Sequence, residues 1–361
     1  MHKVSIVTCN TYNNEEVKQA LLDSLKNIDF NFKNNLKILI KPNILGPHTP
    51  EQGITTHPII IEELCKILKN YNADIYIGDS SGLNTKKSLI KSKISNLSKY
   101  ATIINFDEKE KNYIKIGKEN ISIPKIVFNV DLIINMPKLK THGLTRVTLS
   151  VKNLYGCIQG KTKAFLHVKY PNPKNFSKLL INLENKIKPQ LNIIDGIIGL
   201  EGNGPGTAGT PIKSNIIITS KNPYANDIIT SNIMGFNPYD IHTNKFSNIK
   251  IQDIETIGNS KNLKLNFKKP NIPLIRFFHP LLAIFPKPKI TFEKDKCIRC
   301  LKCQEKCPTN AIIINPNQIC YHKKCIRCLC CIEVCPNAAI YLKDHWTKNL
   351  IKKVYRKLYG K

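Results

Sequence analysis

The chain has 361 residues, of which 42% are hydrophobic, so it can bury the cores of about two domains and is not disordered as a whole. It opens without a basic-flanked apolar run and never reaches the roughly 18 uninterrupted apolar residues of a membrane span, so we expect a cytoplasmic protein. The formal net charge of +29 comes from lysines spread along the whole chain without a nucleic-acid-binding motif. This distribution favours solvated lysines, and nucleic acid is not an expected partner.

Strands and helices are predicted to alternate over residues 1–265. Strands are expected at 3–7, 36–40, 73–77, 131–135, 191–194 and 215–219. Helices are expected at 15–25, where apolar residues recur at helical spacing, at 58–68, which opens with a proline, and at 224–234. This alternation predicts an α/β domain with a mainly parallel sheet covered on both faces.

Polar loops follow four of these predicted strands. They contain Lys41-Pro42-Asn43, the run 78–82, the run 137–142, and a stretch from Asp195 to Gly206. Each is ordinary turn chemistry by itself, but parallel sheets bind ligands at the carboxyl ends of their strands, so the four together predict a cleft. The glycine-rich run 202–209 lacks the spacing of a P-loop or a dinucleotide fingerprint, and we expect it to be a mobile loop.

Eight cysteines between residues 297 and 335 form two runs with the spacing Cys-x2-Cys-x2-Cys-x3-Cys-Pro. Bacterial two-cluster ferredoxins have this spacing, and the fourth cysteine of each run ligates the other cluster. We therefore assign one [4Fe–4S] cluster to Cys297, Cys300, Cys303 and Cys335, and a second to Cys325, Cys328, Cys331 and Cys307. A zinc ribbon, the alternative for paired cysteines, does not require two matched runs of four. Cys320 and Cys330 are interpreted as spectators, although an exchange of Cys330 for its neighbour Cys331 stays open.

Three regions are predicted to follow the large domain. The proline-rich segment 266–289 is expected to be an extended connector. Residues 290–343 are expected to form a small α+β, ferredoxin-like two-cluster domain. The tail 344–361 has apolar residues every four positions between lysines, which predicts a basic amphipathic helix. Such a helix could contact an anionic membrane surface, dock on a partner, or pack on the protein's own ferredoxin-like domain.

Four segments carry a resemblance to a known family. They are Lys-Pro-Asn at 41–43, Gly-Asp-Ser at 78–80, Asn-Met-Pro-Lys-Leu-Lys-Thr-His at 135–142 and Val-Lys-Asn-Leu-Tyr-Gly at 151–156. These segments resemble the hallmarks of the domain of unknown function 362 family of iron–sulfur proteins, whose members often carry a ferredoxin module. The resemblance covers residues 1–265, and it implies a fold and a site rather than an activity.

The run 138–142 supplies the catalytic candidates. Lys138, Lys140 and His142 alternate, so an extended backbone is expected to point all three to one side. Cationic groups that converge at a strand end suit an anionic substrate or a developing oxyanion, and His142 suits general acid–base catalysis near neutral pH. The ordinary alternatives are solvated lysines and a surface or hydrogen-bonded histidine.

The predicted substrate-binding residues are Lys41, Asn43, Asp79, Ser80, Lys152 and Asn153. Lys152 and Asn153 are expected to lie on a helix that starts near Thr145, whose free amides would also favour an anion. Asp79 could instead cap a helix. Cys157 and His167 lie close by, and Cys157 is more simply explained as a small buried apolar residue.

We predict an iron–sulfur electron-transfer protein, an oxidoreductase from an anaerobe that couples two [4Fe–4S] clusters to a small anionic substrate in the large-domain cleft. The first alternative is a non-enzymatic electron carrier or adaptor that docks a redox partner protein. The second is a non-redox enzyme in which the clusters are structural. No flavin or nicotinamide motif indicates a further cofactor.

Overall fold

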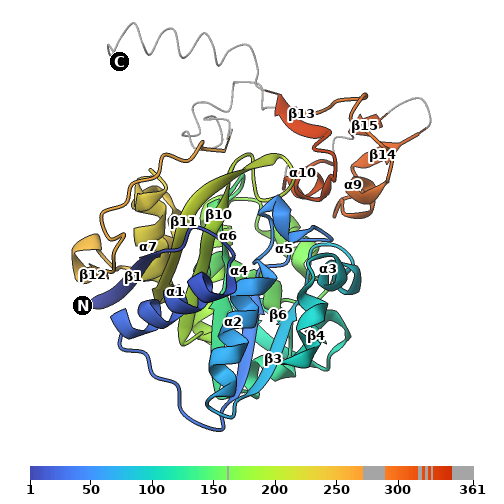
Figure 1. Ribbon diagram of the computed structural model, residues 1–361. Helices are drawn as coiled ribbons and strands as arrows, with labels where there is room; N and C mark the ends of the chain where they lie inside the picture. The colour runs from blue at the N-terminus through green and yellow to red at the C-terminus, as the bar shows by residue number, and fades with distance from the viewer. Residues whose placement is uncertain (161, 271–288, 316–318, 322–323, 327, 344–361) are drawn as a thin grey trace, which may run out of the picture.

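The computed structural model describes all residues except 161, 271–288, 316–318, 322–323, 327 and 344–361 (Figure 1). Most of the predicted connector and the whole predicted tail lie outside the described residues. The predicted domain boundaries at 265 and 290 therefore stay predictions. Every described helix is too short or too polar to reach across a lipid bilayer.

One ten-stranded sheet organises the large domain. Its strands run in the order β12-β1-β11-β10-β7-β2-β3-β4, with β8 beside β10 and β9 beside β8. The strands are β1 (His2–Thr8), β2 (Lys37–Pro42), β3 (Asp74–Asp79), β4 (Thr102–Asn105), β7 (Leu132–Met136), β8 (Lys138–His142), β9 (Arg146–Thr148), β10 (Leu191–Gly202), β11 (Gly209–Ser220) and β12 (Ile254–Ile257). Neighbours from β4 to β10 pair in parallel, whereas β11 is antiparallel to both β10 and β1. The prediction of a mainly parallel sheet is confirmed.

Helices cover both faces of this sheet. They are α1 (Asn14–Asn27), α2 (Pro58–Lys69), α3 (Thr85–Lys91), α4 (Ser150–Asn153), α5 (Thr162–Lys169), α6 (Pro173–Ile187), α7 (Pro223–Ile233) and α8 (His242–Lys245). Successive residues of a strand point to opposite faces, so Ile38 and Ile40 pack against α1 and α2, while Leu39 packs on the side of α6. The hairpin β5 (Lys111–Ile116) and β6 (Glu119–Pro124) extends the core on the α6 side. The α/β prediction is thereby confirmed.

The prediction of a helix that starts near Thr145 is wrong about where the helix begins. The chain there forms β9, and α4 begins at Ser150. The amides of Ser150 and Val151 donate to the carboxylate of Asp227, at 2.7 and 3.0 Å. These amides are therefore satisfied by the protein's own aspartate and do not face an external anion.

The glycine-rich run 202–209 is the turn between the long strands β10 and β11, and we call it the tongue. It contacts the C-terminal module: Thr207 Oγ1 donates to the carbonyl oxygen of Cys335. A Cβ atom on Gly206 would lie 2.5 Å from the carbonyl oxygen of Glu333, so only glycine permits this approach. The tongue, expected to be a mobile loop, is a contact between two parts of the chain.

The C-terminal module is small and mixed in structure. It contains α9 (Lys302–Glu305), α10 (Cys330–Val334) and the antiparallel pairs β13 (Lys289–Phe292) with β16 (Ile340–Lys343) and β14 (Ile312–Ile314) with β15 (Ile319–Tyr321). This arrangement confirms the small α+β fold. The module sits over the tongue and the loops near α5 (Figure 1).

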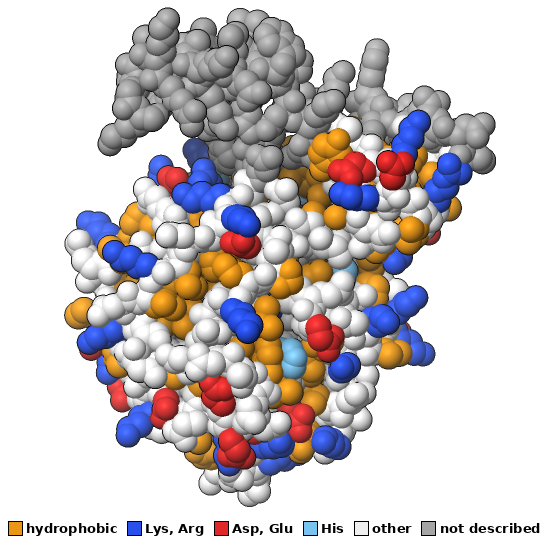
Figure 2. All heavy atoms as spheres, turned by 45° about the horizontal axis from the view of Figure 1, so that its top comes forward, with side chains coloured by type: hydrophobic (Ala, Val, Ile, Leu, Met, Phe, Trp, Pro, Cys, Tyr) orange, Lys and Arg blue, Asp and Glu red, His pale blue; other side chains and the backbone are white. Residues whose placement is uncertain are grey.

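Basic side chains on the visible face of the large domain lie scattered among acidic and neutral ones (Figure 2). This pattern matches the even spread of lysines along the sequence and shows no single basic groove on that face.

Candidate functional site

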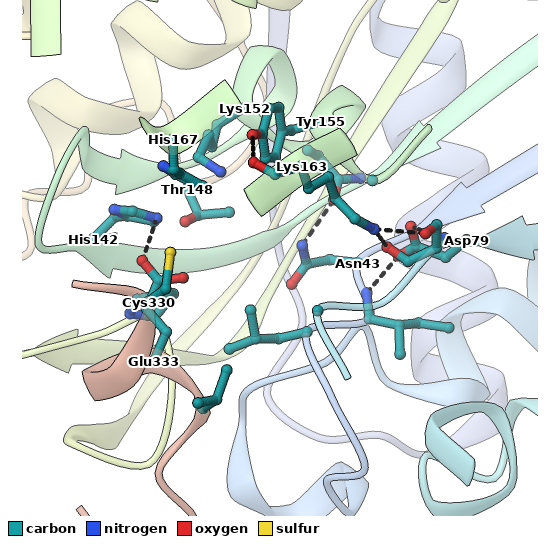
Figure 3. Close-up of a pocket in the computed structure, with 18 of the residues that line it drawn as sticks. Asn43, Asp79, His142, Thr148, Lys152, Tyr155, Lys163, His167, Cys330 and Glu333 are labelled. Atoms are coloured by element: carbon teal, nitrogen blue, oxygen red, sulfur yellow. Dashed lines mark hydrogen bonds and ion pairs between the residues drawn. The ribbon is translucent and has the colours of Figure 1, made fainter. Parts of the chain in front are cut away.

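A cavity of about 830 Å³, counting the part that opens to solvent, lies where the C-terminal module meets the sheet (Figure 3). Loops after β2 and β3 form one wall, and β8, β9, α4 and α5 form another. Helix α10 of the module closes the cavity from the opposite side. Clefts in which a few polar side chains converge are the usual binding places of small molecules.

All six predicted substrate-binding residues line this one cavity, although they come from three separate segments of the sequence: Lys41, Asn43, Asp79, Ser80, Lys152 and Asn153. Of the three catalytic candidates, Lys140 and His142 line it and Lys138 does not. The parallel strands β2 and β3 end at the same edge of the sheet, which explains why their loops meet.

Lys138 forms a buried ion pair away from the cavity. Its ammonium lies 2.8 Å from Asp195 Oδ2 and also donates to the hydroxyl of Tyr12 at 2.8 Å. In the pairing of β8 with β10, Lys138 lies opposite Asp195 and Lys140 lies opposite Leu200, so the register of the two strands shifts between these positions. Regular alternation along β8 would have given the two lysine side chains the same surroundings. The expectation that the three side chains converge is therefore not met for Lys138.

The end of the cavity beside β3 is a tightly bonded network. Lys41 Nζ lies 2.9 Å from Asp79 Oδ1, and Asp79 also accepts the backbone amides of Ile44 and Ser80. Burial raises the pKa of Asp79, although Lys41 opposes this shift. A Cβ atom on Gly156 would lie 2.2 Å from Asp79 Oδ1, which gives a steric reason for the glycine at this position.

Lys163, on α5, completes this end. Its ammonium donates to the hydroxyl of Ser80 at 2.6 Å and to the carbonyl oxygens of Ser80 and Ser81. Burial lowers the pKa of Lys163 to about 8, while Asp107 and Asp79 oppose the shift. Both lysines at this end are therefore committed to protein acceptors.

The opposite end, beside α10, is differently built. Lys140 is fully buried and donates to the carbonyl oxygen of Ile54 at 2.8 Å. Burial, reinforced by the charge of Lys152, lowers the pKa of Lys140 to about 7. Lys152 is enclosed but keeps accessible surface toward the cavity, and its ammonium lies 4.5 Å from the centre of the Tyr155 ring. Burial lowers the pKa of Lys152, and no described residue accepts a hydrogen bond from its ammonium.

His142 has a defined tautomer in its neutral form. Its Nδ1 accepts the backbone amides of Leu144 and Thr145, at 3.0 and 3.3 Å, so the ring proton resides on Nε2. Nε2 lies 3.4 Å from Glu333 Oε1, across the boundary between β8 and α10 (Figure 3). Burial raises the pKa of Glu333 to about 7, against the opposing charges of Lys152 and Lys140. The hydroxyl of Thr148 is buried at the same end and forms no hydrogen bond within the described structure.

Sequence reasoning missed several cavity residues, which are Thr148, Tyr155, Lys163, His167, Lys306, Cys330 and Glu333. Tyr155 belongs to the segment 151–156 that carries the family resemblance, and this was an available signal. The last three come from the module, and nothing in their local sequence indicates that they face the large domain. Cys157 does not line the cavity, and burial raises the pKa of its thiol to about 12.

The predicted cluster ligands gather in the module. Cys297, Cys300, Cys303 and Cys335 line one common hollow, as expected for one set of four. Backbone amides donate to the sulfurs of Cys297, Cys307 and Cys335, at 3.1 to 3.2 Å, and such hydrogen bonds tune the potential of iron–sulfur clusters.

Two predicted ligands of the second set, Cys328 and Cys331, are buried. Burial raises the pKa of Cys331, as do the neighbouring charges of Cys328 and Cys325. Within the described residues no His, Cys, Asp and Glu side chains are grouped as a single-ion site. Thiolates around a hollow, with amide donors, fit an iron–sulfur cluster.

A family model described as Domain of unknown function (DUF362) matches residues 38–232, which is more than half of the chain. The chain belongs to this family. The DUF362 match contains every cavity residue of the large domain named above, and it confirms the resemblance carried by the four segments.

A second family model, the 4Fe-4S binding domain (Fer4), matches residues 290–313. This match contains the first cysteine run, from Cys297 to Cys307, and shows that the protein binds a [4Fe–4S] cluster. The second run, which begins at Cys325, lies beyond the matched residues.

A thylakoid-associated protein of Synechocystis sp. is 28% identical to this chain over 240 residues, covering 62% of this chain and 71% of that protein. The lactate racemase apoprotein from Thermoanaerobacterium thermosaccharolyticum matches weakly in structure, with a TM-score of 0.38 and 14% identity over 62% of this chain. The match covers 55% of the racemase, so the chain spans about half of that protein.

Proposed function

We propose that this DUF362 protein is a cytoplasmic oxidoreductase in which two [4Fe–4S] clusters exchange electrons with a small anionic substrate bound in the cavity. The proposal assigns the second cluster to Cys325, Cys328, Cys331 and Cys307, as the repeated spacing predicts.

Helix α10 is the observation that carries this proposal. It holds Cys331, a predicted ligand of the second cluster, and the same short helix contributes Cys330, Glu333 and Val334 to the cavity wall. A substrate in the cavity would therefore lie next to the residues that hold a cluster. A short distance between cluster and substrate favours electron transfer. The contact between the module and the large domain would therefore serve to bring the two together.

The charges of the cavity favour an anion. Its lining contains Lys41, Lys140, Lys152, Lys163 and Lys306 against two carboxylates, Asp79 and Glu333. The lysines beside β3 are already bonded to protein acceptors, so we place the anionic group of the substrate at Lys152 and Thr148. Among the described residues, the ammonium of Lys152 has no hydrogen-bond acceptor and the hydroxyl of Thr148 has no hydrogen-bond partner. A buried polar group without a partner costs about 1–3 kcal/mol, which a bound anion would offset.

Proton transfer is assigned to His142 and Lys140. The Nε2 proton of His142 is directed at the α10 side of the cavity, and Lys140 has a pKa near neutrality because it is buried. Groups with such pKa values can give or take a proton during turnover. The clusters held by the module would supply or accept single electrons. Asn43 and Asn153 hold the β2 loop against α4, since the Asn43 amide donates to the Asn153 side chain at 2.8 Å.

The test is anaerobic reoxidation of the reduced protein. The chain would be reconstituted, confirmed to hold about eight irons, and reduced with dithionite. Visible and EPR spectra would then be followed while fractions of cellular metabolites are added. We expect one fraction to reoxidise the protein, and a His142→Gln variant with unchanged cluster spectra to lose at least about 100-fold in rate.

The alternative, a non-enzymatic electron carrier or adaptor, makes the opposite prediction. Its clusters would stay reduced with every metabolite fraction and discharge only to a protein partner. Equal reoxidation rates in the wild type and His142→Gln would remove His142 from the site without deciding between the two.

Peripheral membrane contact through the tail stays part of the proposal. The basic amphipathic pattern of residues 344–361 supports it, as does the Synechocystis relative, which is named a thylakoid-associated protein.

A further inference from the structure

An exposed apolar rim borders the hollow of the first cysteine set. Ile298 is 62% exposed and Leu301 is 42% exposed, and both line the hollow together with Cys300, which is itself exposed. This hollow shares no lining residue with the substrate cavity. The module therefore has two distinct faces, one toward the cavity at α10 and one toward solvent at this rim.

Ten large apolar side chains are exposed in the described part of the chain, and two of them, Ile298 and Leu301, lie together on this rim. Ile298 and Leu301 are three residues apart and lie beside a thiol that the sequence assigns to a cluster. If these two positions served only to shield the cluster from solvent, polar residues such as lysine or serine could occupy them. Exposed apolar groups next to functional residues indicate a contact surface.

The charges around the rim are mainly basic. Lys296 lines the hollow, and in the sequence Lys294, Arg299 and Lys302 stand within four residues of Ile298, against the acidic Glu293 and Asp295. Lys296 and Glu293 neutralise each other at 2.7 Å, which leaves three basic groups against one acidic group. The whole chain carries a formal charge of +29, so its long-range field also attracts anions.

We infer that the rim of Ile298, Cys300 and Leu301 docks an acidic one-electron carrier protein. Basic side chains would steer the carrier, and the small apolar rim would exclude water at the point of closest approach. Transient redox complexes use small contacts of this kind. A second copy of this chain would bring the same positive charge to the rim, and electrostatic repulsion disfavours it.

The transfer is balanced and needs no other reactant. One electron leaves the carrier, which is oxidised, and enters this protein, which is reduced, or the reverse. No covalent bond forms or breaks. The inference rests on the proposed function only for the presence of clusters, and it requires no particular substrate.

The test is electron exchange between the reconstituted full chain and an acidic plant-type ferredoxin, followed by stopped-flow in whichever direction it runs. The Ile298→Asp variant places a carboxylate on the rim. Its matched control is Ile90→Asp, because Ile90 on α3 is 60% exposed and lies outside the module. We expect the second-order rate constant to fall about tenfold or more in Ile298→Asp and to stay unchanged in Ile90→Asp. Wild-type exchange should slow with added salt, whereas reduction by dithionite should be equal in all three proteins.

Carbodiimide cross-linking of the wild-type chain to the same ferredoxin gives a second measurement that needs no variant. Cross-links at Lys294, Lys296 or Lys302 would support the inference, even if Ile298→Asp failed to hold its cluster. Cross-links confined to the large domain would overturn it, as would equal exchange rates in the two Asp variants. Anionic vesicles that bind through Ile298, with carrier exchange unaffected, would assign the rim to a membrane and also overturn it. Rapid carrier exchange without any oxidising metabolite would leave this inference standing and reject the enzymatic proposal.

Discussion

Lys138 and Lys140 lie two residues apart on β8 and differ in what surrounds their ammonium groups. Lys138 is matched by a carboxylate, Asp195, so its charge is compensated inside the fold. Among the described residues, Lys140 has only the carbonyl oxygen of Ile54 within hydrogen-bonding distance, and it stands near the positive Lys152. Burial without a carboxylate partner lowers the pKa of Lys140 to about 7, so this lysine can change its charge under ordinary conditions.

This pKa predicts a pH dependence of anion binding. Lys140 is charged below about pH 7 and neutral above it, so affinity for an anion should fall as the pH rises. We expect a loss of up to about tenfold between about pH 6 and about pH 8, measured by calorimetric titration with sulfate, whose charge is constant in this range.

The matched variant is Lys140→Met, in which the pH dependence should become shallower. Glu333 gains charge in the same range and acts in the same direction, so Glu333→Gln measures its share. An affinity that does not change with pH in the wild type would contradict the assignment of Lys140.

Among the elements, the tongue between β10 and β11 connects the two parts of the chain. Its Gly206 and Thr207 meet the backbone of the module at Glu333 and Cys335. Pro205 of the same turn lines the substrate cavity. The tongue thus fixes α10 at the cavity and shapes the cavity wall at the same time.

Removing the Thr207 hydroxyl should loosen this contact. Thr207→Val keeps the side-chain shape but removes the donor from the tongue to the carbonyl oxygen of Cys335, at a cost of about 1 kcal/mol. That oxygen then keeps the amide of Ala338, at 3.4 Å within the module, as its donor. Amide hydrogen exchange in α10 should then accelerate about fivefold, if its protection depends on docking. Thr207→Ser keeps the donor and should exchange like the wild type, and equal acceleration in both variants would show that the hydroxyl does not anchor the module.

At the scale of the whole molecule, the two parts differ in what holds them together. Three large clusters of buried aliphatic residues stabilise the α/β domain. Among the residues of the module that the structure describes, the buried cluster contains seven, and three of them are the predicted ligands Cys303, Cys331 and Cys335. So small a core needs bound metal to stay folded.

Removal of iron should therefore unfold the module and spare the large domain. After oxidation and chelation, we expect calorimetry to show that the transition of the α/β domain remains while the contribution of the module disappears. Reconstitution with iron and sulfide should restore it. A calorimetric trace unchanged by iron removal would mean that the module folds without its clusters.

The sequence alone determined much of this protein, because several signals are local. Cysteine spacing indicated the clusters, since ligands close in sequence must surround one cubane. Hydrophobic periodicity located the central strands and helices, and the position of polar loops after parallel strands placed Lys41 and Asp79 in one cavity. The helix expected near Thr145 was wrong, because Arg146–Thr148 pairs with β8, a contact that local propensity does not report.

Only the tertiary structure decided which charges are compensated and which parts meet. Lys138 and Lys140 belong to one motif, and their difference arises from Asp195, a residue more than fifty positions away. Cys330 was interpreted as a spectator, yet the docking of α10 brings it and Glu333 into the cavity wall. These contacts depend on how the module packs against the large domain. The residues next to Cys330 and Glu333 in the sequence carry no information about that packing.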